Sequence, residues 1–162
     1  MAINSAGAKV VLPFTKALFP LIETRAPILF SSATCINLFS KISVGATENL
    51  IIAACFAKGK TILKNCAIEP EIKDLVNFLL KMGCKIKWIG KRSIKISGVK
   101  QIKEISYSVM FDRIEAGTYL IAAVVTEGDL RIKNIIPQII QTEINLLKKI
   151  GAKIIMKKNY VK

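Results

Sequence analysis

The sequence contains no histidine. Imidazole is the side chain that most readily exchanges protons near neutral pH, and it is the commonest metal ligand, so its absence excludes every histidine-based catalytic or metal site. Acid–base chemistry would therefore fall to aspartate, glutamate, lysine or cysteine. We predict no metal site and no cofactor.

Paired cysteines are missing as well. The four cysteines, Cys35, Cys55, Cys66 and Cys84, form no CxxC pair and do not have the spacing of zinc ligands. Three of them lie inside strongly apolar segments, which predicts buried, reduced thiols. The sequence also lacks a secretory leader and any apolar run near the roughly 20 residues that a membrane span needs. These absences favour a cytoplasmic protein that does not cross a membrane.

Aromatic residues and arginines are scarce. Aromatics account for 7% of the chain, and arginine stands only at Arg25, Arg92, Arg113 and Arg131, although the formal net charge is +14. The charge comes mostly from scattered lysines, whereas a specific reader of nucleic acid gathers its basic residues and adds stacking aromatics. Nucleic acid is therefore disfavoured as a partner. A solvated lysine-rich surface is the simplest interpretation, with a basic groove for RNA or a phosphorylated small molecule as the alternative.

Apolar content, by contrast, is sufficient for a packed core. Hydrophobic residues make up 52% of the 162 residues, a length that suits one ordinary domain or two small lobes. The first 40 residues are poorly organised, because Pro20 and Pro27 interrupt the apolar pattern, and the sequence predicts neither helix nor strand between Glu23 and Leu38. From Lys41 onward the pattern becomes regular.

The regular part of the chain contains an internal repeat. Residues 50–65 (LIIAACFAKGKTILKN) match residues 119–134 (YLIAAVVTEGDLRIKN) without a gap, and each copy is followed by a predicted helix that begins at proline, over 70–82 and 137–150. After this helix the first copy continues with GCKI (83–86) and the second copy with GAKI (151–154). Matches of this length in the same order indicate a duplicated unit.

The first copy has the pattern of a βαβαββ unit. Its predicted elements are a leading strand at 42–44, a buried helix that ends at a left-handed Gly59, a strand over 60–65, the helix that begins at Pro70, and a hairpin of strands at 85–89 and 93–97.

The second copy is predicted to be shorter. Tyr107, Val109 and Phe111 alternate as a strand, Asp112 is placed to cap the next helix, and the chain ends after one hairpin strand. The sequence therefore predicts three segments, which are an eroded N-terminal segment (1–40), a complete βαβαββ repeat (41–110) and a second, incomplete repeat (111–162).

The start of the first repeat has the features of an anion site. A short β-type run at Ile42 and Val44 meets Gly45 and then an apolar helix, so backbone N–H groups and the positive end of a helix dipole lie beside a flexible turn. Thr47 can cap this helix through its hydroxyl. Junctions of this kind are common in α/β proteins, and a single one is more often only a connection.

Three motifs resemble the enolpyruvyl transferase family. They are residues 41–49 (KISVGATEN), 67–72 (AIEPEI) and 112–118 (DRIEAGT), in the order and spacing of that family and most closely of its nucleotide-sugar branch. The resemblance is essentially continuous from Lys41 to the C-terminus. It implies an α/β fold, the inside-out α/β barrel that the family builds from six βαβαββ units in two lobes, of which this chain would hold fewer than three.

The resemblance also implies an activity. Its substrates would be phosphoenolpyruvate and UDP-N-acetylglucosamine, with transfer of the enolpyruvyl group to the 3-hydroxyl of the sugar in peptidoglycan synthesis. The implied substrate-binding residues are Lys41, Ile42, Ser43 and Val44 against the nucleotide-sugar, Lys9 against phosphoenolpyruvate, Arg25 in the substrate region, Glu69 in the active-site cleft, and Asp112 with Arg113 near the crossing between the lobes.

The catalytic groups of that family are incomplete here. Its Pro-Gly-Gly-Cys loop is absent from the sequence, its aspartate base would lie beyond Lys162, and Cys35, the remaining candidate for a nucleophile, is better explained as a structural thiol. We therefore expect the chain alone to bind the nucleotide-sugar without transferring the enolpyruvyl group. The alternative is a non-catalytic basic α/β remnant that binds RNA or a partner protein. Because apolar faces meant for the other units would be exposed, we also predict self-association.

Overall fold

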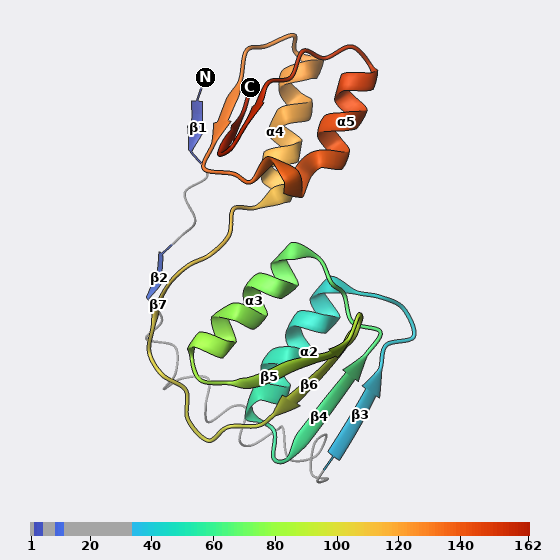
Figure 1. Ribbon diagram of the computed structural model, residues 1–162, viewed down its shortest axis with the longest axis vertical. Helices are drawn as coiled ribbons and strands as arrows, with labels where there is room; N and C mark the ends of the chain where they lie inside the picture. The colour runs from blue at the N-terminus through green and yellow to red at the C-terminus, as the bar shows by residue number, and fades with distance from the viewer. Residues whose placement is uncertain (1, 5–8, 12–33) are drawn as a thin grey trace. The chain divides into compact units, whose positions relative to one another are not determined.

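The computed structural model describes residues 2–4, 9–11 and 34–162, with side chains from residue 39 onward (Figure 1). The chain divides into two compact units. The first unit comprises Lys9–Tyr107, and the second unit comprises Met1–Ala8 together with Ser108–Lys162. Each unit has its own hydrophobic core. The three segments predicted from the sequence (1–40, 41–110 and 111–162) follow the sequence repeat, whereas these units follow spatial contacts. The three segments therefore remain a prediction.

The first unit is a four-stranded sheet with two helices. Its strand order is β3-β4-β6-β5, in which β3 and β4 are parallel and the other neighbours are antiparallel. Figure 1 shows α2 and α3 packed side by side against this sheet. The elements follow the predicted βαβαββ order: β3 (Thr34–Leu38), α2 (Val44–Phe56), β4 (Lys60–Lys64), α3 (Pro70–Lys81), β5 (Lys85–Gly90) and β6 (Ser93–Ser97).

The core of the first unit lies between the helices and the sheet. On α3, the side chains of Ile72, Val76 and Leu79 recur at helical spacing and are at most 5% exposed. On β6, Ile94 and Ile96 are fully buried while their neighbours are half-exposed, which is the alternation of a strand with one face toward a core. The helical period of about 3.6 residues and the strand period of 2 thus place an apolar face of α3 and an apolar face of the sheet toward the same core.

The start of the first repeat differs from the prediction. The leading strand is β3, in a stretch for which the sequence predicts neither helix nor strand, and Ile42 belongs to no strand while Val44 is already the first residue of α2. The reason is the backbone pairing with β4. β3 pairs with β4 over five residues, whereas only Ile42 and Ser43 of the predicted strand precede α2, which is too short a stretch for such a pairing. Ser43, rather than Thr47, is the N-cap, because its backbone is still extended, at φ −141° and ψ 126°.

The second unit has the same strand arrangement. Its sheet has the order β1-β8-β10-β9, with β1 parallel to β8 and the other neighbours antiparallel. Both strands of its hairpin are present, joined by a turn at Lys158 and Asn159, so the prediction of one hairpin strand is wrong. The elements are β1 (Ala2–Asn4), α4 (Arg113–Val125), β8 (Arg131–Lys133), the 3-10 helix η2 (Pro137–Ile140), α5 (Gln141–Lys149), β9 (Met156–Lys157) and β10 (Tyr160–Val161).

The leading strand of the second sheet comes from the beginning of the chain. The sequence predicts a strand through Tyr107, Val109 and Phe111, whereas the structure has only β7 (Ser106–Ser108), which pairs with β2 (Lys9–Val11) in a separate two-stranded sheet. Phe111 is instead buried in the second core, with 6% of its surface exposed. The physical reason is that β1 already occupies the parallel position beside β8.

Uncommon backbone conformations with positive φ recur at equivalent positions of the two units. Asn65 and Asn134, which coincide in the sequence repeat, both have a φ of 59°. Asparagine tolerates this left-handed conformation better than most residues. Gly83 and Gly151, which follow the second helix of each repeat, have φ values of 97° and 99°. These shared special positions confirm the duplication in three dimensions.

Candidate functional site

One end of the first unit's sheet brings together segment 41–44 and Glu69, which are part of the predicted binding set. Because β3 and β4 are parallel, their carboxyl ends lie at the same edge, where α2 and α3 begin. The turn between β5 and β6 lies there too, since Lys64 at the end of β4 pairs with Ser93 at the start of β6. Ligands of open α/β sheets bind beyond the carboxyl ends of the strands. We name this region the strand-end edge; it comprises residues 39–44, 65–69 and 90–93.

The segment that leads into α2 is exposed. Lys41 and Ser43 are exposed, and Ile42 keeps 46% of its surface in solvent although it is apolar. The Ser43 hydroxyl accepts the N–H of Ala46 at 3.3 Å, and its carbonyl accepts the N–H of Thr47 at 3.1 Å. Val44, the next residue, packs against the core. The segment 41–44 is therefore open to solvent at one end and anchored at the other, at the positive end of a helix.

The loop between β4 and α3 is tied to its neighbours by hydrogen bonds. The Asn65 side-chain amide donates to the carbonyl of Phe39 at 2.9 Å, which joins the loop to the end of β3. The Cys66 N–H donates to the Arg92 carbonyl at 2.9 Å, and Arg92 Nη1 donates back to the Cys66 carbonyl at 3.0 Å. This reciprocal pair fastens the loop to the turn of the β5–β6 hairpin.

Thr47 links the same loop to α2. Its side chain is fully buried, and its hydroxyl accepts the N–H of Ala67 at 3.0 Å while it donates to the Ser43 carbonyl at 2.7 Å. A threonine hydroxyl has one donor, which is used here, and an acceptor oxygen, which is used as well. The hydroxyl predicted to cap the helix thus joins the helix to the strand-end edge instead.

Glu69 stands directly before the first residue of α3. Its carboxylate accepts the N–H of Ile68 at 2.7 Å, and the side chain is half-buried. A carboxylate at this position also lies at the positive end of the α3 dipole. Glu69 therefore belongs to the strand-end edge together with segment 41–44, and its carboxylate is held in place there.

Three cysteines with described side chains are buried in the first unit. Cys55, Cys66 and Cys84 are free and buried, as the sequence predicts. Burial raises the pKa of the Cys66 thiol. A hydrogen bond shared with the Cys84 thiol, together with burial, raises the pKa of Cys55. A protonated thiol is a poor nucleophile, so burial disfavours Cys66 as a nucleophile although it lies at the strand-end edge.

The other predicted site residues lie elsewhere. Lys9 is in β2, Arg25 falls outside the described residues, and Cys35 is in β3, opposite Thr61. A role of the Cys35 side chain therefore stays a prediction. The unit that contains segment 41–44 and Glu69 contains β2 and β3 as well.

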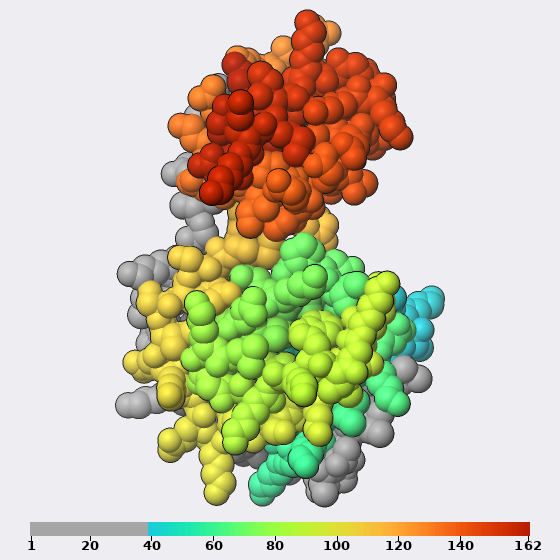
Figure 2. Space-filling view, in the orientation of Figure 1, coloured from blue at the N-terminus to red at the C-terminus, as the bar shows by residue number. Residues whose placement is uncertain are grey.

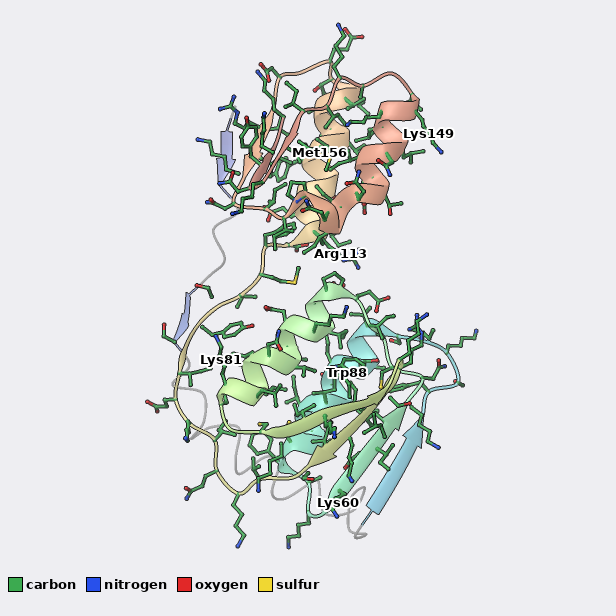
Figure 3. All side chains as sticks on the ribbon, in the orientation of Figure 1. Lys60, Lys81, Trp88, Arg113, Lys149 and Met156 are labelled. Atoms are coloured by element: carbon green, nitrogen blue, oxygen red, sulfur yellow. The ribbon has the colours of Figure 1, made fainter. Side chains whose placement is uncertain are left out.

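Asp112 and Arg113 begin α4 in the second unit. Asp112 is the N-cap, as the sequence predicts, and its carboxylate accepts the N–H groups of Ile114 at 2.7 Å and Glu115 at 3.1 Å. Arg113 is the first residue of the helix (Figure 3). The structure therefore divides the predicted site residues between two units.

Arg92 is a residue of the strand-end edge that the sequence does not single out. It lies in the turn of the predicted hairpin, so the βαβαββ order could have placed it at the carboxyl ends of the parallel strands. Its contact with Cys66 could not have been found in this way, because the two residues are 26 positions apart. Figure 2 shows the tip of this hairpin, in yellow-green, at the surface of the first unit.

Neither a membrane span nor a metal cluster is found in the described part of the chain. No helix among residues 34–162 is long and apolar enough to cross a membrane. Within the same residues, no three or more acidic or cysteine side chains gather as potential metal ligands.

A family model covers almost the whole length of this chain. The family model described as EPSP synthase (3-phosphoshikimate 1-carboxyvinyltransferase) matches residues 2–162. The chain belongs to this family. The predicted relation to the enolpyruvyl transferases is thereby confirmed.

Several curated relatives are named UDP-N-acetylglucosamine 1-carboxyvinyltransferase. The protein of Pelagibacter ubique is 71% identical over 123 residues, which cover 76% of this chain and 30% of the relative. The protein of Psychrobacter sp. is 44% identical over 131 residues, 81% of this chain and 30% of the relative. The chain spans about 30% of the length of these two relatives.

A solved structure shares the fold. The enolpyruvyl transferase NikO from Streptomyces tendae matches 73% of this chain and 29% of its own chain, with a TM-score of 0.64 at 24% sequence identity. Together with the family match, this likeness confirms the predicted α/β fold of the enolpyruvyl transferases.

Proposed function

We propose that this chain is the nucleotide-sugar-binding part of a UDP-N-acetylglucosamine 1-carboxyvinyltransferase. The complete reaction would move the enolpyruvyl group of phosphoenolpyruvate to the 3-hydroxyl of UDP-N-acetylglucosamine and release phosphate. The observation that carries the proposal is the 71% identity to the relative of that name from Pelagibacter ubique. Such a protein would act in the cytoplasm, in peptidoglycan synthesis, on which cell shape and division depend.

The strand-end edge suits the anionic part of this substrate. Segment 41–44 offers an exposed lysine ammonium and lies at the positive end of α2, and both favour a diphosphate. The exposed Ile42 and the half-buried Val44 provide apolar surface beside these charges. We assign Lys41, Ile42, Ser43 and Val44 to the nucleotide-sugar on this basis. Glu69, whose carboxylate would not face a diphosphate, is proposed as a residue of the active-site cleft.

Lys9, Arg25, Asp112 and Arg113 are proposed to take part in substrate binding in the complete protein. Lysine and arginine side chains provide the charge-assisted donors that phosphate and carboxylate groups require. The assignment of Asp112 and Arg113 rests on the motif at 112–118, and that of Lys9 and Arg25 on the family relation.

Calorimetric titration with UDP-N-acetylglucosamine tests the binding. We expect saturable binding to the chain, weakened roughly fivefold by Lys41→Met, which removes one charge-assisted contact. Lys60→Met is the matched control, because Lys60 is an exposed lysine at the opposite end of β4 (Figure 3). Equal losses in the two variants, or no binding at all, would contradict the proposed site.

Phosphate release from phosphoenolpyruvate tests the catalytic part. We expect the chain alone to release no phosphate in the presence of the nucleotide-sugar, since the sequence lacks the Pro-Gly-Gly-Cys loop. Release at a steady rate would show that the chain is a complete catalyst. Shikimate 3-phosphate, the substrate suggested by the name of the family model, is the competing ligand and should not displace the nucleotide-sugar.

An RNA-binding remnant is the second candidate, because the net charge is +14. It predicts an affinity for RNA that falls steeply as salt is added. The scarcity of aromatic residues, 7% of the chain, counts against stacked bases. Weak RNA binding together with saturable nucleotide-sugar binding would eliminate this candidate.

A further inference from the structure

A chain of hydrogen bonds runs from Arg92 to the residue that caps α2. Arg92 Nη1 donates to the carbonyl of Cys66 at 3.0 Å, and the N–H of the same peptide group, which belongs to Ala67, donates to Thr47 Oγ1 at 3.0 Å. The Thr47 hydroxyl then donates to the carbonyl of Ser43 at 2.7 Å. We name these three bonds the Arg92 relay. One peptide group, between Cys66 and Ala67, is thus held from both sides.

The middle of the relay is shielded from water. Cys66, Ala67 and Thr47 have no exposed surface, so solvent cannot replace the bonds between them. Hydrogen bonds in series polarise one another in a low-dielectric interior. The first donor is a permanently charged guanidinium, and charge-assisted bonds are the stronger ones. A change at Arg92 should therefore reach Ser43, although the hairpin turn and α2 are far apart in the sequence.

The second unit shows that the repeat does not need the relay. There the Ile135 N–H donates to the Asn159 carbonyl at 3.3 Å, which is the counterpart of the backbone bond between the first unit's loop and Arg92. Asparagine therefore stands where the first unit has Arg92, and the sequence repeat places Ala116 at the position of Thr47. The backbone bond is common to both units, whereas the guanidinium and the hydroxyl occur only in the unit with the strand-end edge described above.

We propose that Arg92 is a positioning residue for nucleotide-sugar binding, which acts through the relay on Ser43 and on segment 41–44. The inference rests on the proposed function, since this segment is the one assigned to UDP-N-acetylglucosamine. Arg92 orients the segment by fixing the peptide group after Cys66, and with it the Thr47 hydroxyl that holds the Ser43 carbonyl.

The first test compares two neighbouring charges of the hairpin turn. Arg92→Met should weaken the binding of UDP-N-acetylglucosamine about tenfold, because the peptide group after Cys66, and through it segment 41–44, would lose its fixed orientation. Lys91→Met removes the same charge from an exposed neighbour and should change the affinity less than about twofold. Equal affinities of the two variants would overturn the proposal.

The second test asks whether the effect passes through Thr47. In a Thr47→Val background the relay is already broken, so Arg92→Met should cause little further loss of affinity. Thr47→Ser keeps the hydroxyl and should restore the sensitivity to Arg92→Met. A loss in the valine background as large as in the unaltered chain would show that Arg92 acts by another route.

Two controls separate failure of the relay from failure of folding or of the proposed function. Unfolding is followed by the fluorescence of Trp88, the single tryptophan. If Arg92→Met does not fold, Arg92→Ser is used, because serine is polar but lacks both the charge and the reach to the Cys66 carbonyl; an affinity equal to that of Lys91→Met overturns the proposal. If the unaltered chain does not bind UDP-N-acetylglucosamine, the proposed function fails. The amide proton resonance of Ala67 then decides on the relay: a shift in the Arg92 variant and not in Lys91→Met supports it, and equal resonances overturn it.

Discussion

The two units build the same sheet from differently arranged pieces of chain. In both, a leading strand lies parallel to the next strand and a hairpin completes the sheet, in the orders β3-β4-β6-β5 and β1-β8-β10-β9. In the first unit, however, the leading strand immediately precedes its helix, whereas in the second it comes from Ala2–Asn4, more than a hundred residues before β8. The position in the sheet is therefore fixed by the repeat, while the segment that fills it is not.

The first helices of the two repeats also differ in what covers them. Ile114, Ile121 and Val125 of α4 lie on one stripe of the helix and are 60%, 46% and 77% exposed. At the repeat positions of Ile121 and Val125, α2 has Ile52 and Phe56, which are half-buried and pack against the first core. A helix that is apolar nearly all round is suited to burial on more than one side. Within the described residues, α4 is buried on one side only.

The largest effect is expected from equivalent core positions. Ile51 and Leu120 match in the repeat and are 0% and 3% exposed, so replacement of either by alanine should cost about 3 kcal/mol of unfolding free energy. Trp88 packs against the first core, so its fluorescence should report the loss in Ile51→Ala. If the units unfold independently, Leu120→Ala should leave that transition in urea unchanged; an equal shift in both variants would show that the units unfold together.

The origin of the leading strand can be tested with proline. Ile3 pairs with Ile132, and proline at position 3 removes a backbone N–H from β1 and fixes its φ. We expect Ile3→Pro to destabilise the second unit by about 2 to 3 kcal/mol and to leave the first unit unaffected. Amide hydrogen exchange, residue by residue, measures this. Unchanged protection of β8 would show that β1 contributes nothing to the second sheet.

A smaller effect is expected at Tyr107, where the first unit ends. Its hydroxyl donates to Asp74 Oδ1 at 2.9 Å, its ring lies 5.2 Å from that of Phe78, and the Lys81 ammonium lies 4.9 Å from its centre (Figure 3 labels Lys81). Tyr107→Phe should cost about 1 kcal/mol. Tyr119→Phe, at a partly exposed position in the second unit, is the control and should change the unfolding free energy by a few tenths of a kcal/mol at most.

The same tyrosine predicts a dependence on alkaline pH. Burial and the hydrogen bond to Asp74 raise the pKa of Tyr107 from its ordinary 10.0 to about 12. Because the pKa is higher in the folded state, the contribution to stability is fully present below pH 10 and is lost as the pH rises to about 12. Urea unfolding of the first unit between pH 9 and 12 should show this decline, and Tyr107→Phe should remove it. An identical decline in the variant would assign it to other groups.

The smallest effect on stability is expected on the exposed stripe of α4. Because Ile114, Ile121 and Val125 present apolar surface to water, we expect the chain to associate with itself as its concentration rises. Val125→Lys should reduce this association and change the unfolding free energy by less than about 0.5 kcal/mol. Sedimentation velocity over a range of concentrations measures it. A single monomer peak for the unaltered chain would contradict the prediction.

The sequence alone determined the local elements and their order. The helix that begins at Pro70, the hairpin around residues 90–92 and the Asp112 cap follow from short-range physics, since proline, the alternation of apolar residues and a capping carboxylate act within a few positions. The family resemblance of the three motifs added the fold and the proposed ligand. The motif at 41–44 was located correctly as the start of a helix, although its strand and its cap were not.

Only the tertiary structure decided which distant segments meet. It placed β3 beside β4, assigned the leading strand of the second sheet to the beginning of the chain, and joined Arg92 to Cys66 and Thr47 to Ala67. Pairings of this kind depend on which segment completes a ladder or fills a buried polar position, and every candidate segment competes for them at once. A local pattern has no information on that competition, so the relay behind segment 41–44 could be found only in the folded chain.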